Sequence, residues 1–90
     1  MTGTSYYFCY DGIIYKPSDA LPVLEPANAG DTCGYASYGD ALSVLHEYQN
    51  IQSKNTLSLD AATLDKQHKI LDGVEILPNN HMAVYAFLNS

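Results

Sequence analysis

The fold of this chain follows from one stretch, Tyr35–Ile51, which reads YASYGDALSVLHEYQNI. When this stretch is wound at about 100° per residue, its apolar and polar side chains separate onto two sides. The apolar side carries Tyr38, Ala41, Leu42, Val44, Leu45, Tyr48 and Ile51. The polar side carries Ser43, His46, Glu47 and Asn50. The pattern predicts an amphipathic helix lying against a sheet, with Leu42, Leu45 and Tyr48 as its most buried residues.

The two ends of this helix are also marked in the sequence. Ser37 and Asp40 have the spacing of a capping box, with aspartate in place of the usual glutamate, so the helix is expected to start near Ser37. Around Gln52–Asn55 a serine, a lysine and an asparagine follow one another, and there we expect the helix to end.

The N-terminal residues indicate a β-hairpin. Ser5–Tyr10 (SYYFCY) and Ile13–Lys16 (IIYK) are rich in the aromatic and β-branched residues that strands favour. Asp11-Gly12 separates them, and this dipeptide is typical of a two-residue turn in which both residues need a positive φ.

In that register Tyr10 pairs with Ile13, and Phe8 pairs with Tyr15. One face of the hairpin then carries Tyr6, Phe8, Tyr10, Ile13 and Tyr15. The other face carries Tyr7, Cys9, Ile14 and Lys16. A single layer of helices cannot bury tyrosines on both faces, so we expect the surplus rings to form an exposed aromatic and acidic patch.

Residues 17–36 are expected to form mostly a loop. Pro17 ends the second strand because proline cannot donate to the ladder. The apolar residues of 21–24 could make a short edge strand or a helical turn, and Pro26–Gly34 (PANAGDTCG) is expected to be irregular. A long loop in a small domain is often functional, so this segment is a candidate contact surface.

A second helix is expected from about Leu59 to Asp72, with Ser58 as its N-cap and Gly73 just beyond its C-terminus. Its apolar stripe consists of Leu59, Leu64, Ile70 and Leu71, with Thr63 and Gln67 between them. A closing hairpin is expected from Val74–Leu77, a turn at residues 78–80, and His81–Leu88 (HMAVYAFL). The last of these runs is apolar on both faces, which is typical of a central strand.

These elements predict a single α+β domain over residues 1–90. The sheet is expected to be mainly antiparallel and four-stranded, built from two hairpins, with two helices packed on one face in the order ββ–loop–αα–ββ. A hydrophobic share of 47% with 16% charged residues is typical of a folded globule.

Charge restricts the partners. The formal net charge is −6, and the four cationic residues are all lysine, so no arginine is present to read phosphates or guanine edges. Direct binding to nucleic acid or to an anionic membrane is therefore not expected. Residues 1–50 carry six acids and only one lysine, Lys16. A basic partner would be steered toward this half of the chain.

The cellular setting is expected to be the cytoplasm. No basic segment followed by an apolar core, the pattern of a signal peptide, occurs at the start of the sequence, and no apolar run is long enough to span a bilayer. Cys9 and Cys33 would then stay reduced.

Catalytic and metal motifs are weak. Cys33 precedes the first helix between Gly30 and Gly34, where a thiol could be activated, but its base and orienting partner are not evident. None of the usual zinc-binding spacings occurs, and the glycines do not form a phosphate-binding loop. We expect no cofactor and no metal, and we expect Cys9 to be a small core residue.

The preferred hypothesis is a non-enzymatic, acidic protein-binding module. Seven of the eight tyrosines lie in the first 48 residues, the half that is most acidic, and tyrosine is enriched at interfaces. The partner would be a protein that handles nucleic acid and has a basic surface. Proteins of this class are the targets of small phage and mobile-element inhibitors, such as anti-CRISPR and anti-restriction proteins. The candidate partner-binding residues are Tyr7, Asp11, Lys16, Glu25, Asp31, Tyr35 and Asp40. Self-association as a homodimer through a hairpin edge fits the same surface.

The alternative is a small-molecule module, or a minimal cysteine-dependent enzyme. Its pocket would lie between the helices and the 26–36 loop around Cys33, where aromatic and amide groups could hold a nucleotide-like ligand.

Overall fold

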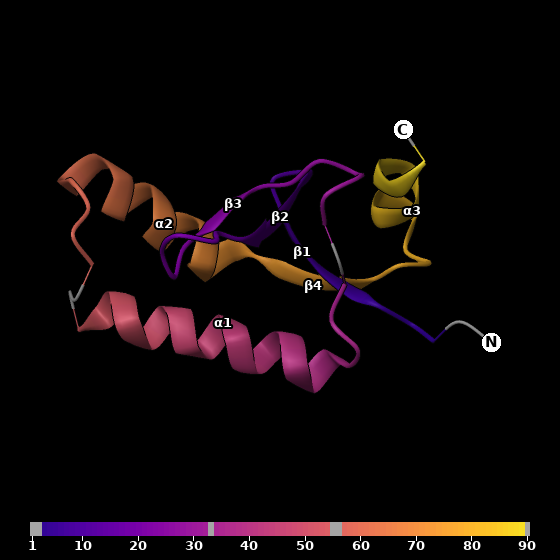
Figure 1. Cartoon of the computed structure of the whole chain (residues 1–90), viewed down its shortest axis with the longest axis horizontal. Coiled ribbons are helices and arrows are strands. Elements are labelled where there is room, and N and C mark those ends of the chain that lie inside the picture. The colour runs from indigo at the N-terminus through magenta and orange to yellow at the C-terminus, as the bar shows by residue number, and fades with distance from the viewer. Residues whose placement is uncertain (1–2, 33, 55–56, 90) are drawn as a thin grey trace.

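A computed structural model describes residues 3–32, 34–54 and 57–89 of the chain (Figure 1). The elements in chain order are β1 (Tyr6–Tyr10), β2 (Ile13–Pro17), β3 (Leu24–Pro26), α1 (Tyr38–Ser53), α2 (Ala61–Gly73), β4 (Glu75–Pro78) and α3 (Met82–Leu88). The four strands form one antiparallel sheet in the order β3-β2-β1-β4. The predicted α+β class and the four-stranded antiparallel sheet are confirmed, but the order of elements differs because one strand comes from the predicted loop and the last segment is a helix.

The first hairpin forms as predicted. Asp11 and Gly12 have φ values of 52° and 76°, so both turn residues adopt the left-handed conformation that the Asp-Gly pair indicated. Tyr10 pairs with Ile13 and Phe8 with Tyr15, which is the expected register. Both strands of the hairpin lie in the interior of the sheet, and β3 and β4 are its edge strands. An edge-to-edge contact between two copies would therefore use β3 or β4 and not the hairpin.

Pro17 is the last residue of β2, as predicted, and it has no N–H to donate to a neighbouring strand. The extended register of the hairpin would place Tyr6 opposite Pro17. Tyr35 is paired with Tyr6 instead: its N–H donates to Tyr6 O at 2.9 Å, and the Tyr6 N–H donates to Tyr35 O at 3.0 Å. This bridge fixes the chain beside β1 immediately before α1 begins.

Helix α1 agrees with its prediction at both ends. The Ser37 hydroxyl accepts a hydrogen bond from the Asp40 N–H at 3.1 Å, which confirms the N-cap, and the helix ends at Ser53. Leu45 is buried as expected, whereas Leu42 and Tyr48 are only half-buried, since Ala41 takes the closest position against the sheet.

Helix α2 begins two residues later than predicted. Its N-cap is Asp60, not Ser58, because the Asp60 carboxylate accepts a hydrogen bond from the Thr63 N–H at 2.7 Å. Gly73 is the last residue of the helix. A Cβ there would lie 2.7 Å from Cε1 of Tyr10, so a side chain at this position would require the Tyr10 ring to shift.

The predicted closing hairpin is wrong. β4 pairs with β1, and residues 82–88 form α3 rather than a strand. His81 starts the helix, its Nδ1 accepting a hydrogen bond from the Ala83 N–H at 3.2 Å. One face of α3 packs against the protein through Val84, Phe87 and Leu88, which have the i, i+3, i+4 spacing of a helix face. The sequence does not reveal this spacing, because the run is apolar at nearly every position.

Helices therefore cover both faces of the sheet, not one as predicted. Figure 1 shows α1 along one side of the strands and α3 on the opposite side. The buried residues of the first face are Phe8, Tyr15, Leu24, Ala41, Leu45, Ile70 and Leu71. Those of the second face are Tyr7, Cys9, Ile14 and Val84. Within the described ranges, no helix is long and apolar enough to cross a membrane.

Candidate functional site

The seven candidate partner-binding residues do not form one site. Lys16, Glu25 and Asp31 meet beside β2 and β3, whereas Tyr35 and Asp40 lie at the start of α1. The other two, Tyr7 and Asp11, lie apart from both groups.

Lys16, Glu25 and Asp31 form a small ionic cluster. Lys16 Nζ lies 2.8 Å from Asp31 Oδ2 and 3.8 Å from Glu25 Oε1, and Glu25 is the cross-strand partner of Lys16. The Asn28 N–H donates to Asp31 Oδ1 at 2.8 Å, so the carboxylate also closes the turn at residues 28–31. The hydrogen bond from Lys16 lowers the pKa of Asp31 below its usual value, and the same bond raises the pKa of Lys16.

This cluster holds the loop after β3 against the sheet. It also occupies the single lysine of the N-terminal half. The pairing leaves the net charge of this half unchanged, and with six acids against one lysine it remains acidic.

The start of α1 carries a cluster of three tyrosines, Tyr6, Tyr35 and Tyr38. The Tyr6 and Tyr38 rings meet edge to face, with centroids 6.0 Å apart and an interplanar angle of 84°. The Tyr35 ring turns inward and packs against Phe8 at a centroid distance of 5.3 Å. The backbone bridge between Tyr6 and Tyr35 and the N-cap at residue 37 place this tyrosine cluster on two rigid elements.

Exposure and charge make the tyrosine cluster suited to contact. Tyr38 is 51% exposed, and Asp40, two residues later in the first turn of α1, is also exposed, on a different side of the helix. The other three lysines, Lys54, Lys66 and Lys69, lie at the C-terminal cap of α1 and on α2. An exposed aromatic ring and an exposed carboxylate can each attract a lysine or arginine side chain of a partner that covers this end of the helix.

Tyr7 and Asp11 cannot join this surface. Tyr7 is 9% exposed and packs in the second core cluster with Val84, so the helix that replaces the predicted strand covers it. Its ring also lies against Gly34, where a Cβ would be 2.9 Å from Tyr7 Cε1. Asp11 is exposed in the hairpin turn, at the opposite end of β1 from Tyr6.

The burial of Tyr35 gives a testable pH dependence. Burial, with a smaller contribution from Tyr48, raises the pKa of Tyr35 to about 12 from its ordinary value of 10.0. Because the folded pKa exceeds the unfolded one, the neutral phenol stabilises the fold below about pH 10, and this contribution is lost as the pH rises toward 12.

We expect alkaline titration followed by ultraviolet absorbance to show tyrosines that ionise only above the ordinary range, together with unfolding. Tyr35→Phe should remove one late-ionising phenol and make stability less dependent on pH in this window. Ionisation of all eight tyrosines near pH 10 with the fold intact would contradict the buried position of Tyr35.

The structure describes one of the two thiols and the metal-ligating side chains of residues 3–32, 34–54 and 57–89. Cys9 is buried in the second core cluster, as predicted, and burial raises the pKa of its thiol. The proposed nucleophile Cys33 lies outside the described residues. Among the residues that are described, no three histidine, cysteine, aspartate or glutamate side chains are grouped so that they could hold a metal ion.

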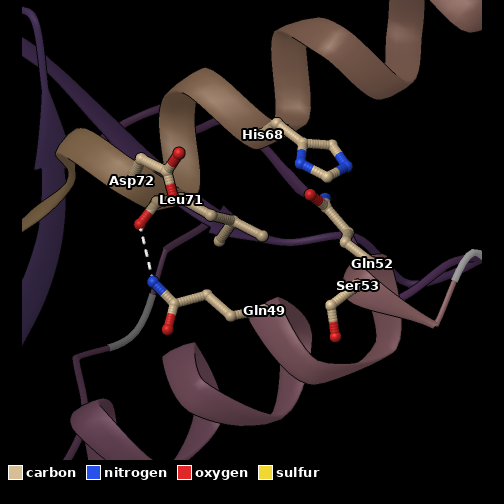
Figure 2. Close-up of a pocket in the computed structure, with 6 residues that line it drawn as sticks. All are labelled: Gln49, Gln52, Ser53, His68, Leu71 and Asp72. Atoms are coloured by element: carbon tan, nitrogen blue, oxygen red, sulfur yellow. Dashed lines mark hydrogen bonds between the residues drawn. The ribbon is translucent and has the colours of Figure 1, made fainter.

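Sequence reasoning missed a cavity between α1 and α2 (Figure 2). The signal that could have found it is Gln52, which continues the apolar stripe of Ala41 and Leu45 and is a polar residue on the buried side of the helix. Comparison of the chain with protein-family models, with curated proteins and with solved structures found no match.

Proposed function

We propose that this chain is a non-enzymatic, acidic protein-binding module that docks on a basic surface of another protein. One observation carries the proposal: an exposed tyrosine and an exposed carboxylate, Tyr38 and Asp40, stand on a rigid helix start in the part of the molecule whose single lysine is already paired. Such a surface complements cationic side chains, and charge complementarity speeds association with a basic partner.

The partner class follows from the same complementarity. Proteins that handle nucleic acid carry cationic grooves for phosphates, and an acidic protein of this size can occupy such a groove. In this proposal the chain acts in the cytoplasm as an inhibitor of the phage or mobile-element type, and it contacts neither nucleic acid nor membrane directly. The net charge of −6 without arginine supports both exclusions.

The proposal is tested by affinity capture from the native host, with mass spectrometry to identify what is retained. The wild type is compared with a double variant, Tyr38→Ser with Asp40→Asn. We expect the wild type to retain a protein with a basic surface and the double variant to bind that protein at least about tenfold more weakly. Raising the salt from about 0.1 M to 0.5 M should weaken capture, because exposed charges are then screened.

A matched control separates this surface from general exposure. Tyr85→Ser with Glu75→Gln removes another exposed tyrosine and another exposed carboxylate, on α3 and β4, and should bind as the wild type does. Equal loss in the control and in the test variant, or full retention in the test variant, would reject the surface at the start of α1.

A further inference from the structure

A cavity of about 330 Å³ opens between the C-terminal half of α1 and α2. Its lining residues are Gln49, Gln52, Ser53, His68, Leu71 and Asp72. Figure 2 shows the Gln52 side chain reaching from α1 toward His68 on α2. The cavity lies at the other end of α1 from the tyrosine cluster, so what it binds is independent of the proposed protein partner.

Gln52 is the unusual group in this cavity. Its side chain is 4% exposed, yet its Nε2 has no hydrogen-bond partner among the described residues. Buried polar groups in folded proteins are nearly always paired, because an unpaired donor keeps the full cost of its lost hydration. Its neighbour Gln49 is paired, donating from Nε2 to Leu71 O at 2.9 Å. The buried amide of Gln52 is thus an unpaired donor at the edge of a cavity, and a turn of its side chain toward the cavity would let it pair with an acceptor atom there.

The remaining lining groups restrict what can enter. Asp72 and Ser53 offer acceptor oxygens, His68 offers a donor and an acceptor on its two ring nitrogens, and Leu71 supplies the apolar contact. Neither lysine nor arginine lines the cavity, and Asp72 repels an anion, so phosphate groups are disfavoured. A wall made mostly of polar groups also disfavours an apolar ligand.

We propose that this cavity binds an uncharged nucleobase or nucleoside, whose base edge pairs with the Gln52 amide. A glutamine amide presents a donor beside an acceptor, and adenine and cytosine each present the complementary pair in an amino group and an adjacent ring nitrogen. Asp72 would accept from sugar hydroxyls at the mouth of the cavity, as carboxylates do in other ribose sites. The volume is at the lower end of the range for small-molecule sites, which suits a ligand of this size.

The experiment is a titration of the isotopically labelled protein with adenosine, and separately with cytidine, followed by NMR. We expect saturable shifts at the amides of Gln52, His68 and Leu71, including the side-chain amide of Gln52. Gln52→Met keeps the side-chain length and removes the amide, and it should weaken binding at least about tenfold. Its spectrum without ligand establishes that the variant is folded.

Two comparisons make the result decisive. His46→Ala removes an exposed histidine of α1 that does not line the cavity, and it should bind as the wild type does. Adenosine 5′-monophosphate should bind more weakly than adenosine because of Asp72. The proposal is overturned if neither nucleoside gives saturable shifts up to about 10 mM, if Gln52→Met binds equally well, or if the monophosphate binds more tightly than the nucleoside.

Discussion

Replacing Gln67 with methionine should lower the free energy of unfolding by about 2–4 kcal/mol, although the side chain keeps its length. Gln67 is 7% exposed, and its amide pairs with both backbone groups of Leu24. Leu24 N–H donates to Gln67 Oε1 at 3.1 Å, and Gln67 Nε2 donates to Leu24 O at 2.9 Å. Leu24 is 1% exposed, so the substitution leaves a buried donor and a buried acceptor unpaired. Urea unfolding of both proteins measures the difference.

The matched control for this change is the same substitution at the other buried glutamine. Gln52→Met removes an amide whose Nε2 is already unpaired, so it should leave stability unchanged or raise it by about 1 kcal/mol. The two glutamines are buried to a similar degree, but only the amide of Gln67 is fully paired. We therefore expect the same substitution to have opposite effects on stability at the two positions. A loss of similar size at both positions would contradict this account of the two amides.

The second large effect is expected from Phe8→Ala, which should cost about 3–5 kcal/mol. Phe8 is 1% exposed, in the middle of the first core cluster, where its ring packs against Tyr35. Small domains have about 5–15 kcal/mol in total, so the variant should be close to unfolding at room temperature.

Ile13→Ala is the control for Phe8, since Ile13 belongs to the same hairpin but is 45% exposed. It should cost less than about 1 kcal/mol. Thermal unfolding followed by circular dichroism compares the three proteins. A Phe8→Ala variant as stable as Ile13→Ala would show that the core is not centred on β1.

Local signals in the sequence predicted the elements that local chemistry decides. Asp11-Gly12 predicted the turn and the register of the hairpin, because few other residues accept a positive φ. Ser37 predicted the start of α1, because a hydroxyl there satisfies a free N–H of the first turn.

The remaining elements depend on contacts that are distant in the sequence. In β3 the backbone N–H and C=O of Leu24 pair with Gln67, 43 residues away, and no pattern around Leu24 reports that partner. The run at 82–88 is apolar at nearly every position, so its period does not separate strand from helix. That one error also moved Tyr7 from the core to the predicted surface, because the sequence offered no second layer to cover it.

The candidate site was predictable only in part. The concentration of tyrosines and acids in the N-terminal half is visible in the sequence, but their division into core and surface is not. Tyr7 and Tyr15 are buried, whereas Tyr38 and Tyr85 are exposed. Lys16, Glu25 and Asp31 were expected to face a partner; the structure pairs them with one another and leaves both carboxylates exposed in part, so that expectation stays a prediction.

The central claim, that the start of α1 is the surface that meets a basic partner, is tested most directly by hydrogen–deuterium exchange of the protein alone and in complex with the captured partner. Protection should appear at Tyr35, Tyr38 and Asp40 and in the adjoining N-terminal end of β1, with little change on α2 and α3. Protection confined to α2 or α3, with exchange at residues 35–40 unchanged, would contradict the claim.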